Sequence, residues 1–324
     1  MIDLNSCNHR FTSVEDRGIS SKYWIEKDGK SYLFKANFLY DSDPNVMKLN
    51  SKTNYGEVLM SRVMKRLGIP CVEAIFAKGS IGKDICDGVL IESYLTSNIV
   101  DNISFKTMIS YARNTNDGYY QYNNVADCVE IVKGISGKLG KCIDIEKVKD
   151  QLTIMCIVDY FFGQADRNTT NIEFLITSDN QMKLAPMFDN GHCLSFTCET
   201  QGSRSYSKEL KENKFNVGYL GNKGIFFLSN CGYNDIYSTH NTRNLVLDIC
   251  EVASKNKRYS KLVNTLMNLD IAQEIVKIDK ENDTKINSDY INSAEVIFNN
   301  RKRMFLNEWV KYKPTCSQET IFGK

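Results

Sequence analysis

Two polar loops, joined by what reads as a short hairpin, constrain this sequence more than any other feature. The first loop ends at Asn171 and the second begins at Asp189, with strand-like segments at 172–176 and 182–185 between them. Both residues lie nine positions from Asn180, close to the centre of the turn. Because an antiparallel pair returns the chain to its starting edge, a symmetric hairpin would place Asp189 beside Asn171 at its open end.

The residue types in these loops suit a hard metal ion. Asp166, Asn171 and Asp189 offer carboxylate and amide oxygens, the ligands that Mg²⁺ prefers. We expect Asn171 and Asp189 to bind the metal, and Asp166 to accept a proton from an incoming hydroxyl. Phosphoryl transfer needs these parts together with a lysine on the phosphates. The alternative is that all three are ordinary loop residues, since Asp and Asn are common in turns.

The required lysine is expected near the N-terminus. Two strand-like segments flank Asp28-Gly29, a strong signal for a two-residue hairpin loop. The resulting register pairs Lys22 with Lys35, and strand alternation puts Lys35 on the same face as Leu33. Lys35 is therefore the candidate for the phosphates of ATP. The alternative is a lysine at a strand edge, where its charge discourages aggregation.

A helix is expected after this hairpin, because apolar residues recur at helical spacing: Leu59, Met60, Val63, Met64 and Leu67. Asn54 is its expected N-cap, and Gly68 with Pro70 is expected to end it. Glu57, in the first turn, is the candidate partner of Lys35. The alternative is that Glu57 completes a capping box with Asn54.

A phosphate-binding loop is expected at 17–22, before the hairpin, because backbone N–H groups and serine hydroxyls can hold phosphate oxygens. It supplies three candidate ATP-binding residues: Gly18, Ser20 and Ser21. This segment matches neither of the familiar glycine-rich nucleotide motifs. The adenine is expected at the crossover that contains Glu92 and Tyr94, where it would be bound through backbone groups.

The chain divides into two parts that differ in predicted secondary structure. Residues 1–95 read as strands around one helix, and residues 96–324 as mainly helical, with a long irregular segment at 199–245 and helices at 246–312. The helical pattern is strongest at 145–162. This pattern predicts an α+β, bilobal fold with a small β-rich N-lobe and a mainly helical C-lobe. Ligand sites favour such junctions between lobes.

Composition narrows the class of protein. The 41 basic and 39 acidic residues give a net charge of +2, which offers no support for direct binding of nucleic acid. The 11 cysteines show no C-x-x-C spacing, so we expect most to be reduced, as in a cytoplasmic protein. No secretory signal peptide or transmembrane segment is recognisable. Secretion as an effector into a host cell stays open.

Taken together, these motifs resemble those of the HipA-like serine/threonine kinases, including the smaller CtkA-type members. Those kinases carry a strand lysine, a D-R-x-x-x-N catalytic loop and a metal loop that follows L-A-P-x-[FY]. The matching residues here are Lys35, then Asp166–Asn171, then Leu184–Gly191, and the run Asp159–Gly163 is also similar. The resemblance covers about residues 15–200 and implies a protein-kinase-like fold.

The resemblance also implies roles and partners. It implies ATP and Mg²⁺ as cofactors, Asp166 as the catalytic base, Asn171 and Asp189 as metal ligands, and Lys35 on the ATP phosphates. It implies a serine or threonine of a protein as the acceptor, and an antitoxin or host protein as a possible partner. Members of the family can phosphorylate a serine of their own phosphate loop, and Ser20 and Ser21 lie where that serine would be.

Other classes remain open at this point. Type II phosphatidylinositol kinases combine similar loops, and Asp189-Asn190-Gly191 followed by His192 suits a lipid kinase. Against that reading, the sequence has no basic amphipathic helix or palmitoylation cluster for docking to a membrane. A nucleotide-binding pseudokinase module and a small-molecule phosphotransferase are further alternatives. The presence of all four expected residues, Lys35, Asp166, Asn171 and Asp189, disfavours a pseudokinase.

Overall fold

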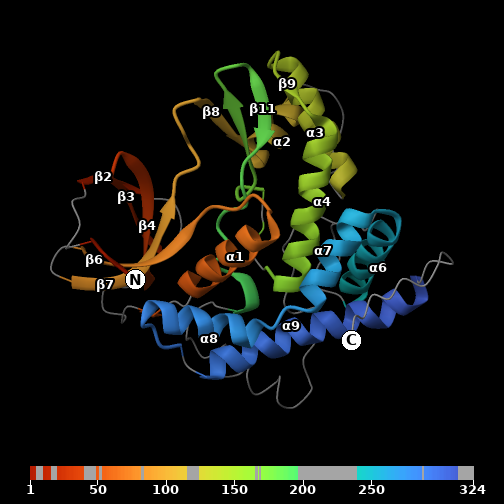
Figure 1. Ribbon diagram of the computed structural model, residues 1–324. Helices are drawn as coiled ribbons and strands as arrows, with labels where there is room; N and C mark the ends of the chain where they lie inside the picture. Colours follow the sequence, from red (N-terminus) through yellow and green to blue (C-terminus); the bar gives the residue numbers. More distant parts are fainter. Residues whose placement is uncertain are drawn as a thin grey trace. The chain divides into compact units, whose positions relative to one another are not determined.

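The computed structural model describes residues 1–4, 10–15, 20–39, 49–50, 53–81, 84–114, 124–164, 167, 169–195, 239–286 and 288–312 (Figure 1). These residues form two compact units. The first comprises the described residues of Met1–Ile99, Ala185–Phe215 and Ala272–Ala294. The second comprises those of Val100–Leu184, Asn216–Ile271 and Glu295–Lys324.

A seven-stranded sheet forms the centre of the first unit. Its strands are β1 (Ile2–Asp3), β2 (Arg10–Glu15), β3 (Ser20–Lys27), β4 (Lys30–Leu39), β5 (Leu49–Asn50), β6 (Ala74–Ile81) and β7 (Asp84–Glu92). They are ordered β1-β6-β7-β4-β3-β2, with β5 paired to β4. Strand β4, which carries the candidate lysine, is therefore an internal strand, and the strand-edge explanation for that lysine is wrong.

The hairpin of β3 and β4 has the register that the sequence predicts. Asp28 and Gly29 both have positive φ, 52° and 72°, as a two-residue type I′ loop requires. Lys22 pairs with Lys35 across the two strands. Because β3 already begins at Ser20, the second half of the expected phosphate loop is strand rather than loop.

The two faces of β4 have different surroundings. Phe34 and Ala36 are buried in an apolar cluster on one face, together with Leu4, Ile25, Ala77, Cys86 and Leu90. Lys35 and Leu33, which alternate with them, lie on the other face, as predicted. Lys35 pairs with Val89, which in turn pairs with Phe76, so buried apolar residues lie beside the lysine on the β7 side of the strand.

Helix α1 (Thr53–Leu67) packs on this second face of the sheet. There the ring centroids of Tyr55 and Phe76 lie 4.9 Å apart. The helix ends at Gly68, whose φ of 67° is the left-handed conformation expected of a terminating glycine. Its start differs from the prediction. Asn54 lies inside the helix and accepts the backbone N–H of Tyr55, so it is not the N-cap.

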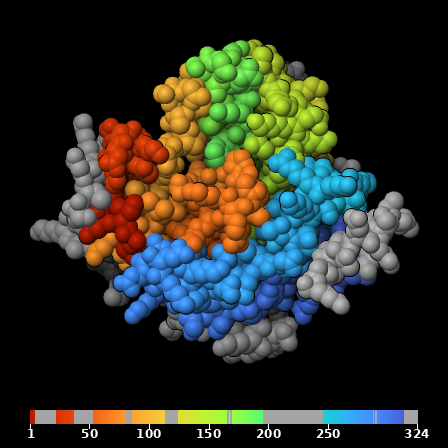
Figure 2. All heavy atoms as spheres, viewed as in Figure 1, coloured from red at the N-terminus to blue at the C-terminus, as the bar shows by residue number. Residues whose placement is uncertain are grey.

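Helix α8 (Ile271–Asn282) also belongs to the first unit, from its second residue onward. In Figures 1 and 2 it lies alongside α1, with α8 in blue and α1 in orange. The short helical turn η2 (Cys193–Ser195) completes this unit, together with the first residues of α9 (Ser288–Trp309). The N-terminal half of α1 is consequently buried on all sides.

The second unit is mainly helical. Its helices are α2 (Phe105–Asn114), α3 (Val125–Lys138), α4 (Ile145–Phe162), α6 (Thr239–Lys255), α7 (Lys257–Met267), most of α9 and the short η5 (Val310–Tyr312). A four-stranded sheet has the order β8-β10-β11-β9, formed by β8 (Ile99–Ser104), β10 (Glu173–Thr177), β11 (Gln181–Leu184) and β9 (Cys142–Ile143). The helix predicted from the helical pattern at 145–162 is confirmed as α4. It begins after the N-cap Asp144 and ends at the left-handed Gly163.

The hairpin of β10 and β11 has its axis one residue away from the predicted position. Phe174 pairs with Leu184, and Ile176 with Met182, so the axis passes through Asp179. The loop has three residues, and its last, Asn180, has a φ of 66°, the left-handed geometry typical of such loops. Asn171 and Asp189 are therefore not equidistant from the turn, and the symmetry argument for bringing them together does not hold.

The mixed α+β fold predicted from the sequence is confirmed, with an N-terminal sheet and a mainly helical C-terminal part. Most of the segment predicted to be irregular, 199–245, lies outside the described residues, but its last part is helical because α6 starts at Thr239. Among the residues described, no helix is long and apolar enough to cross a membrane. The boundary predicted at residue 95 stays a prediction.

Candidate active site

Three charged side chains meet on the α1 side of the first sheet. The Nζ of Lys35 donates to Glu57 Oε1 and to Asp189 Oδ1, each at 2.6 Å. The exposed fraction of these side chains is 13% for Lys35, 2% for Glu57 and 28% for Asp189. The structure thus brings together the candidate phosphate lysine, its predicted helix partner and one predicted metal ligand, and it leaves Asp189 the most accessible of the three.

The electrostatics of this cluster favour the charged forms. Burial alone lowers the pKa of Lys35, but the charges of Asp189 and Glu57, with the hydrogen bonds to both, outweigh it, so this pKa lies above its ordinary value. The charge of Lys35 holds the pKa of Asp189 well below its usual range, against the effect of burial. Lys22 and His192 lower the pKa of Asp189 further. Asp189 is therefore ionised at neutral pH.

Glu57 also anchors the loop that carries Asp189. Its second oxygen, Oε2, accepts the backbone N–H of Asn190 at 3.0 Å. The carboxylate of Glu57 therefore joins Lys35 to the loop, and the alternative that it only caps its own helix is wrong. Asp189 itself has a φ of 53°, a left-handed conformation that is uncommon for a residue with a side chain.

Two glycines allow this loop to lie directly on α1. A Cβ atom on Gly56 would lie 2.6 Å from the carbonyl oxygen of Gly191, and one on Gly191 would lie 2.8 Å from Thr53 Cβ. Real Cβ atoms do not approach other atoms so closely, so both positions need glycine for the backbones to touch. The loop 189–191 is thus held against the first turn of α1 by backbone contact as well as by Glu57.

The chain leading to this loop is held at the other end of α1. Met187 forms a parallel bridge with Cys71, in which its N–H donates to Pro70 O at 3.0 Å and its carbonyl accepts from Val72 N at 2.9 Å. Asn190 is fully buried, and its side-chain amide lies 3.5 Å from Cys71 Sγ and from Met187 O. The segment 187–190 is therefore fixed to the first unit on both sides of Asp189.

This donor set fits a divalent cation and phosphate groups. Asp189 supplies an ionised, partly accessible carboxylate oxygen, which is the kind of ligand that Mg²⁺ binds. Lys35 supplies a buried ammonium group, and Lys22 adds positive charge next to it. Within the described residues no cluster of three or more His, Cys, Asp or Glu side chains forms a dedicated metal site. A partly accessible carboxylate such as that of Asp189 suits a magnesium ion that keeps several waters and also binds phosphate oxygens.

The second unit holds the other predicted loop, and its arginine is fully buried. Arg167, 1% exposed, makes a two-pronged ion pair with Asp159 of α4, with Nε–Oδ2 at 3.0 Å and Nη2–Oδ1 at 3.2 Å. Its Nη1 reaches the carbonyl oxygen of Asn171 at 3.5 Å. Arg167 therefore ties the end of α4 to the far end of the loop. Asp166, the candidate base, lies outside the described residues.

Asn171 is buried, with 8% of its surface exposed, and its Oδ1 accepts a weak hydrogen bond from Thr170 Oγ1 at 3.5 Å. The backbone on either side is bound to the start of α2, because Phe105 N donates to Ile172 O and Lys106 N to Thr169 O. Asn171 and Asp189 are described in different units. Their joint binding of a metal ion stays a prediction.

The remaining candidates lie around the rest of the first unit. Gly18 is outside the described residues, and Ser20 and Ser21 begin strand β3. Glu92 ends β7 and pairs with the exposed Lys30 at 2.6 Å, so its carboxylate is on the surface. The ring of Tyr94 packs on that of Phe188, next to Asp189 in sequence, with centroids 5.5 Å apart. This contact links the predicted adenine segment to the loop that carries Asp189.

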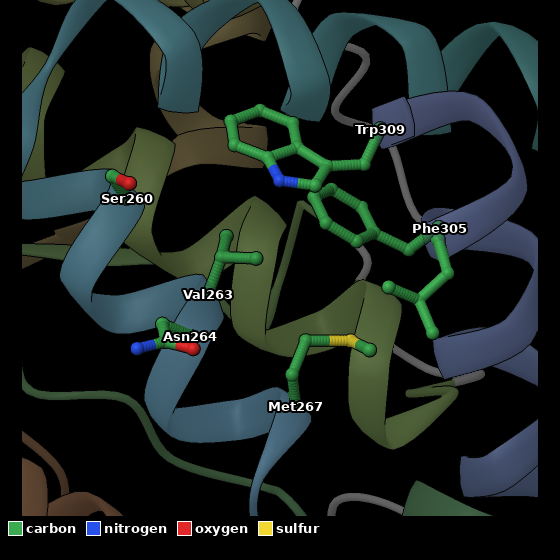
Figure 3. Close-up of a pocket in the computed structure, with 7 residues that line it drawn as sticks. Ser260, Val263, Asn264, Met267, Phe305 and Trp309 are labelled. Carbon is green, nitrogen blue, oxygen red and sulfur yellow. The ribbon is translucent and has the colours of Figure 1, made fainter. Parts of the chain in front are cut away.

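A hollow in the second unit is lined mostly by apolar side chains, unlike the charged cluster of Lys35, Glu57 and Asp189 (Figure 3). It lies between α7 and α9, with the stacked rings of Phe305 and Trp309 on one side. None of the described residues that line it is charged. A triphosphate with its metal ion needs cationic and carboxylate groups, so this hollow is a poor candidate for a nucleotide site.

Sequence reasoning missed the pair of Asp159 and Arg167. Asp159 was noted only as part of a run similar to a kinase family. The signal that could have found it is Asp159 itself, the single acidic residue in the mostly apolar helix segment 152–162. A carboxylate buried in such a helix requires a cationic partner.

The role of Gly56 and Gly191 was also missed, since close backbone contact between distant segments leaves no local pattern.

Comparison with known proteins adds a likeness of fold. No protein-family model matches the chain, and no curated protein matches its sequence. Among solved structures, the proinflammatory kinase CtkA from Helicobacter pylori is similar over 97% of this chain and 99% of its own, with 14% identity and a TM-score of 0.61. HipA from Shewanella oneidensis MR-1, solved in a toxin–antitoxin complex with HipB and operator DNA, is similar over 92% of this chain and 66% of its own. For HipA the identity is 11% and the TM-score 0.45, a value too low to carry an argument. The chain therefore has the fold of the CtkA kinase along nearly its whole length, and the likeness predicted from its motifs is confirmed at the level of fold.

Proposed function

We propose that this protein is an ATP- and Mg²⁺-dependent kinase that transfers the γ-phosphate to a serine or threonine hydroxyl of a protein. The observation that carries the proposal is the position of Lys35, buried between Glu57 and Asp189. In protein kinases a strand lysine must pair with a helix glutamate while a metal-loop aspartate is in place. The same three residue types meet here on the same kinds of element.

Lys35 has the properties of a phosphate-orienting group. Its raised pKa keeps the ammonium group protonated at neutral pH, and the N–H group beyond the two that bind Glu57 and Asp189 can donate to a phosphate oxygen. Glu57 holds the ammonium group in position from a side chain that is itself buried and hydrogen-bonded to Asn190. The lysine is thus fixed before a nucleotide arrives, which lowers the entropic cost of orienting one.

Asp189 and Asn171 are the proposed ligands of the metal ion. Asp189 supports this role because it is ionised and the least buried member of its cluster. When bound, Mg²⁺ would neutralise negative charge on the β- and γ-phosphates. Asp166 is the proposed base, which would orient the acceptor hydroxyl and receive its proton. Arg167 supports the loop of Asp166 and Asn171 through its buried pair with Asp159.

The acceptor is proposed to be a protein hydroxyl because of the fold shared with a kinase and the motifs of the two loops. A protein partner, whether an antitoxin or a host protein, is part of the same proposal. Ser20 and Ser21 are the proposed sites of autophosphorylation. A phosphate carries about −1.5 to −2 charges at neutral pH, which would repel ATP if it were added near Lys35.

A labelling experiment tests this function. The protein would be incubated with Mg²⁺ and ATP labelled in the γ-phosphate, alone, with casein or myelin basic protein as general protein acceptors, and with phosphatidylinositol vesicles. We expect label on protein, its loss in Lys35→Met, and its retention in Lys27→Met, a lysine at the turn of the same hairpin that pairs with Asp28. Mass spectrometry would show whether Ser20 or Ser21 is labelled.

The outcomes separate the alternatives. Label on lipid alone would establish a lipid kinase instead. ATP binding without transfer to any acceptor would favour a pseudokinase module. No ATP binding and no transfer would reject the proposal.

A further inference from the structure

One face of α1 makes polar contacts that none of the proposed chemistry uses. Tyr55, Arg62 and Arg66 are spaced seven and four residues apart, so they project from the same side of the helix. All three reach α8, the helix that lies alongside α1 in Figure 2. The two helices meet through the ends of long side chains, and these contacts run along almost the full length of α1.

The first contact lies closest to the candidate site. The hydroxyl of Tyr55 donates to Asp279 Oδ1 at 2.9 Å, and Thr284 Oγ1 donates to the same oxygen at 2.8 Å. The other oxygen of Asp279 accepts Ile286 N at 3.2 Å. Asp279 thus fixes the end of α8 and the turn that follows, and it holds Tyr55 with the same carboxylate.

The second and third contacts are ion pairs further along α1. Arg62 binds Glu281 through two nitrogens, at 2.5 and 2.9 Å, in the two-pronged geometry that gives an arginine–carboxylate pair its specificity. Arg66 binds Glu274 at 2.9 Å, and the side chain of Glu274 is only 10% exposed. Single exposed ion pairs contribute little, but three contacts between the same two helices restrict how α1 can shift.

A shift of α1 would act directly on the candidate site. Tyr55 lies two residues before Glu57, and Gly56 between them is in backbone contact with Gly191. Glu57 binds Lys35 at 2.6 Å and Asn190 N at 3.0 Å, so a movement of about 1 Å would break one contact or the other. The position of α1 therefore governs both the lysine and the loop of Asp189.

We propose that α8 acts as a clamp that positions α1, with Tyr55, Arg62 and Arg66 as positioning residues that hold Glu57 on Lys35 and Asn190. These residues are not among the proposed nucleotide and metal ligands and act only through the helix that they fix. The effect of the clamp on catalysis rests on the proposed function, whereas its effect on α1 does not.

The experiment uses a charge exchange in the full chain. Arg62→Glu opposes Glu281 with a like charge, and the double variant Arg62→Glu/Glu281→Arg restores an opposite pair. Lys65→Glu is the matched control, because Lys65 is on the same helix but pairs with Glu73 of the first sheet region rather than with α8. Tyr55→Phe is a milder fourth variant that removes one hydroxyl and leaves the packing on Phe76.

Two measurements are made on each variant. Hydrogen–deuterium exchange of the amides of 53–67 reports the opening of α1 whether or not the protein is active. We expect exchange to rise about tenfold in Arg62→Glu, the factor that corresponds to about 1.4 kcal/mol, and to return toward the wild-type rate in the double variant. The turnover of phosphate transfer at saturating ATP should fall in Arg62→Glu, because Glu57 is displaced in the closed state as well, and it should recover in the double variant.

The outcomes separate the clamp from simple packing and from the proposed function. Equal exchange in wild type, Arg62→Glu and Tyr55→Phe would overturn the clamp. So would a lowered melting temperature in Arg62→Glu with normal α1 exchange and normal turnover per folded molecule, or failure of the double variant to recover either readout. A wild-type protein that neither binds ATP nor transfers phosphate would reject the proposed function, and the exchange data would still decide whether α8 positions α1.

Discussion

Two aspartates that pair with cationic side chains, Asp189 and Asp159, differ in how their environments shift their pKa values. Asp189 in the first unit and Asp159 in the second each contact a cationic side chain at 3.0 Å or less. The pKa of Asp189 lies below its ordinary value, chiefly because of the charge of Lys35. The pKa of Asp159 lies above its ordinary value, chiefly because of burial, although Arg167 opposes the shift.

The difference shows that a short ion pair does not by itself stabilise a charge. Asp189 is 28% exposed and has Lys35, Lys22 and His192 around it, so attraction exceeds the cost of leaving water. Asp159 is 15% exposed and faces Arg167, a partner that is itself completely buried, so the desolvation cost dominates. The first pair suits binding and chemistry, whereas the second suits holding a loop in place.

The largest expected effect on stability comes from breaking the second pair. Arg167→Ala would leave Asp159 buried without its cationic partner, and we expect the free energy of unfolding to fall by about 3–5 kcal/mol. Urea denaturation monitored by circular dichroism would measure this loss. The double variant Arg167→Met/Asp159→Leu should recover most of it, because neither charge is then buried. A loss below about 1 kcal/mol in the single variant would mean that the pair is only a surface contact.

The next effect separates chemistry from structure in the same loop. Asp166→Asn keeps the shape of the proposed base but removes its charge, and we expect phosphate transfer to fall by roughly 100-fold, or about 2.7 kcal/mol of barrier. The affinity for ATP with Mg²⁺ and the melting temperature should change little. Turnover and nucleotide affinity measured on one preparation would test this. Near-normal turnover per folded molecule would remove Asp166 from the chemistry.

A smaller effect is expected from the backbone contact that holds the loop of Asp189. Gly56→Ala places a methyl group 2.6 Å from Gly191 O, so α1 and the loop must separate, and overpacking of this kind costs about 1–3 kcal/mol. The control is Gly134→Ala on α3, where a Cβ atom meets nothing within 4 Å. That change should raise stability by about 0.5–1 kcal/mol. Equal stability of the two variants in thermal unfolding would contradict this account, because it would show that the loop 189–191 can move away from α1 at no cost.

The smallest expected effect is on how stability depends on pH, and it tests the difference between Asp189 and Asp159. The stability that Asp189 contributes is complete above the pKa of an unfolded aspartate, about 3.9, and is lost as the pH falls below it toward the lower folded pKa. The cost of ionising Asp159 behaves in the opposite way: it is present above its raised folded pKa and is relieved as the pH falls through that value.

Urea denaturation between pH 3 and 7 would measure how the free energy of unfolding changes with pH. Relative to the wild type, the two variants should change that slope in opposite directions. Asp189→Asn should flatten the rise of stability with pH, and Asp159→Asn should make it steeper. Parallel curves for the two variants would contradict the account of their environments.

Local patterns predicted the elements of the fold well. The Asp28-Gly29 loop defines the register of β3 and β4, and alternation along β4 puts Lys35 on the face opposite Phe34, as observed. The helical pattern at 145–162 predicted α4 at its observed bounds. In these cases the signal lies within a few residues, where turn geometry and side-chain period act directly.

Contacts between distant segments were harder to predict. Glu57 could equally have capped its own helix, and only the fold shows it bound to Asn190, 133 residues away. The contacts of α1 with α8 join residues more than 200 positions apart and leave no periodic signal. The axis of the β10–β11 hairpin was misplaced by one residue because Asn180 occupies the left-handed last position of a three-residue loop. Such features depend on tertiary packing, which a local pattern does not encode.

The most direct test of the central claim is metal-dependent binding of ATP by the cluster of Lys35, Glu57 and Asp189. The melting temperature of the wild type would be measured with ATP alone, with Mg²⁺ alone and with both, and the series repeated for Asp189→Ala. A ligand present at about 100 times its dissociation constant stabilises the folded state by about 2.7 kcal/mol, so binding would raise the melting temperature measurably. We predict a rise with ATP and Mg²⁺ together in the wild type and none in Asp189→Ala; an equal rise in both proteins would contradict the role of Asp189 and the account built on it.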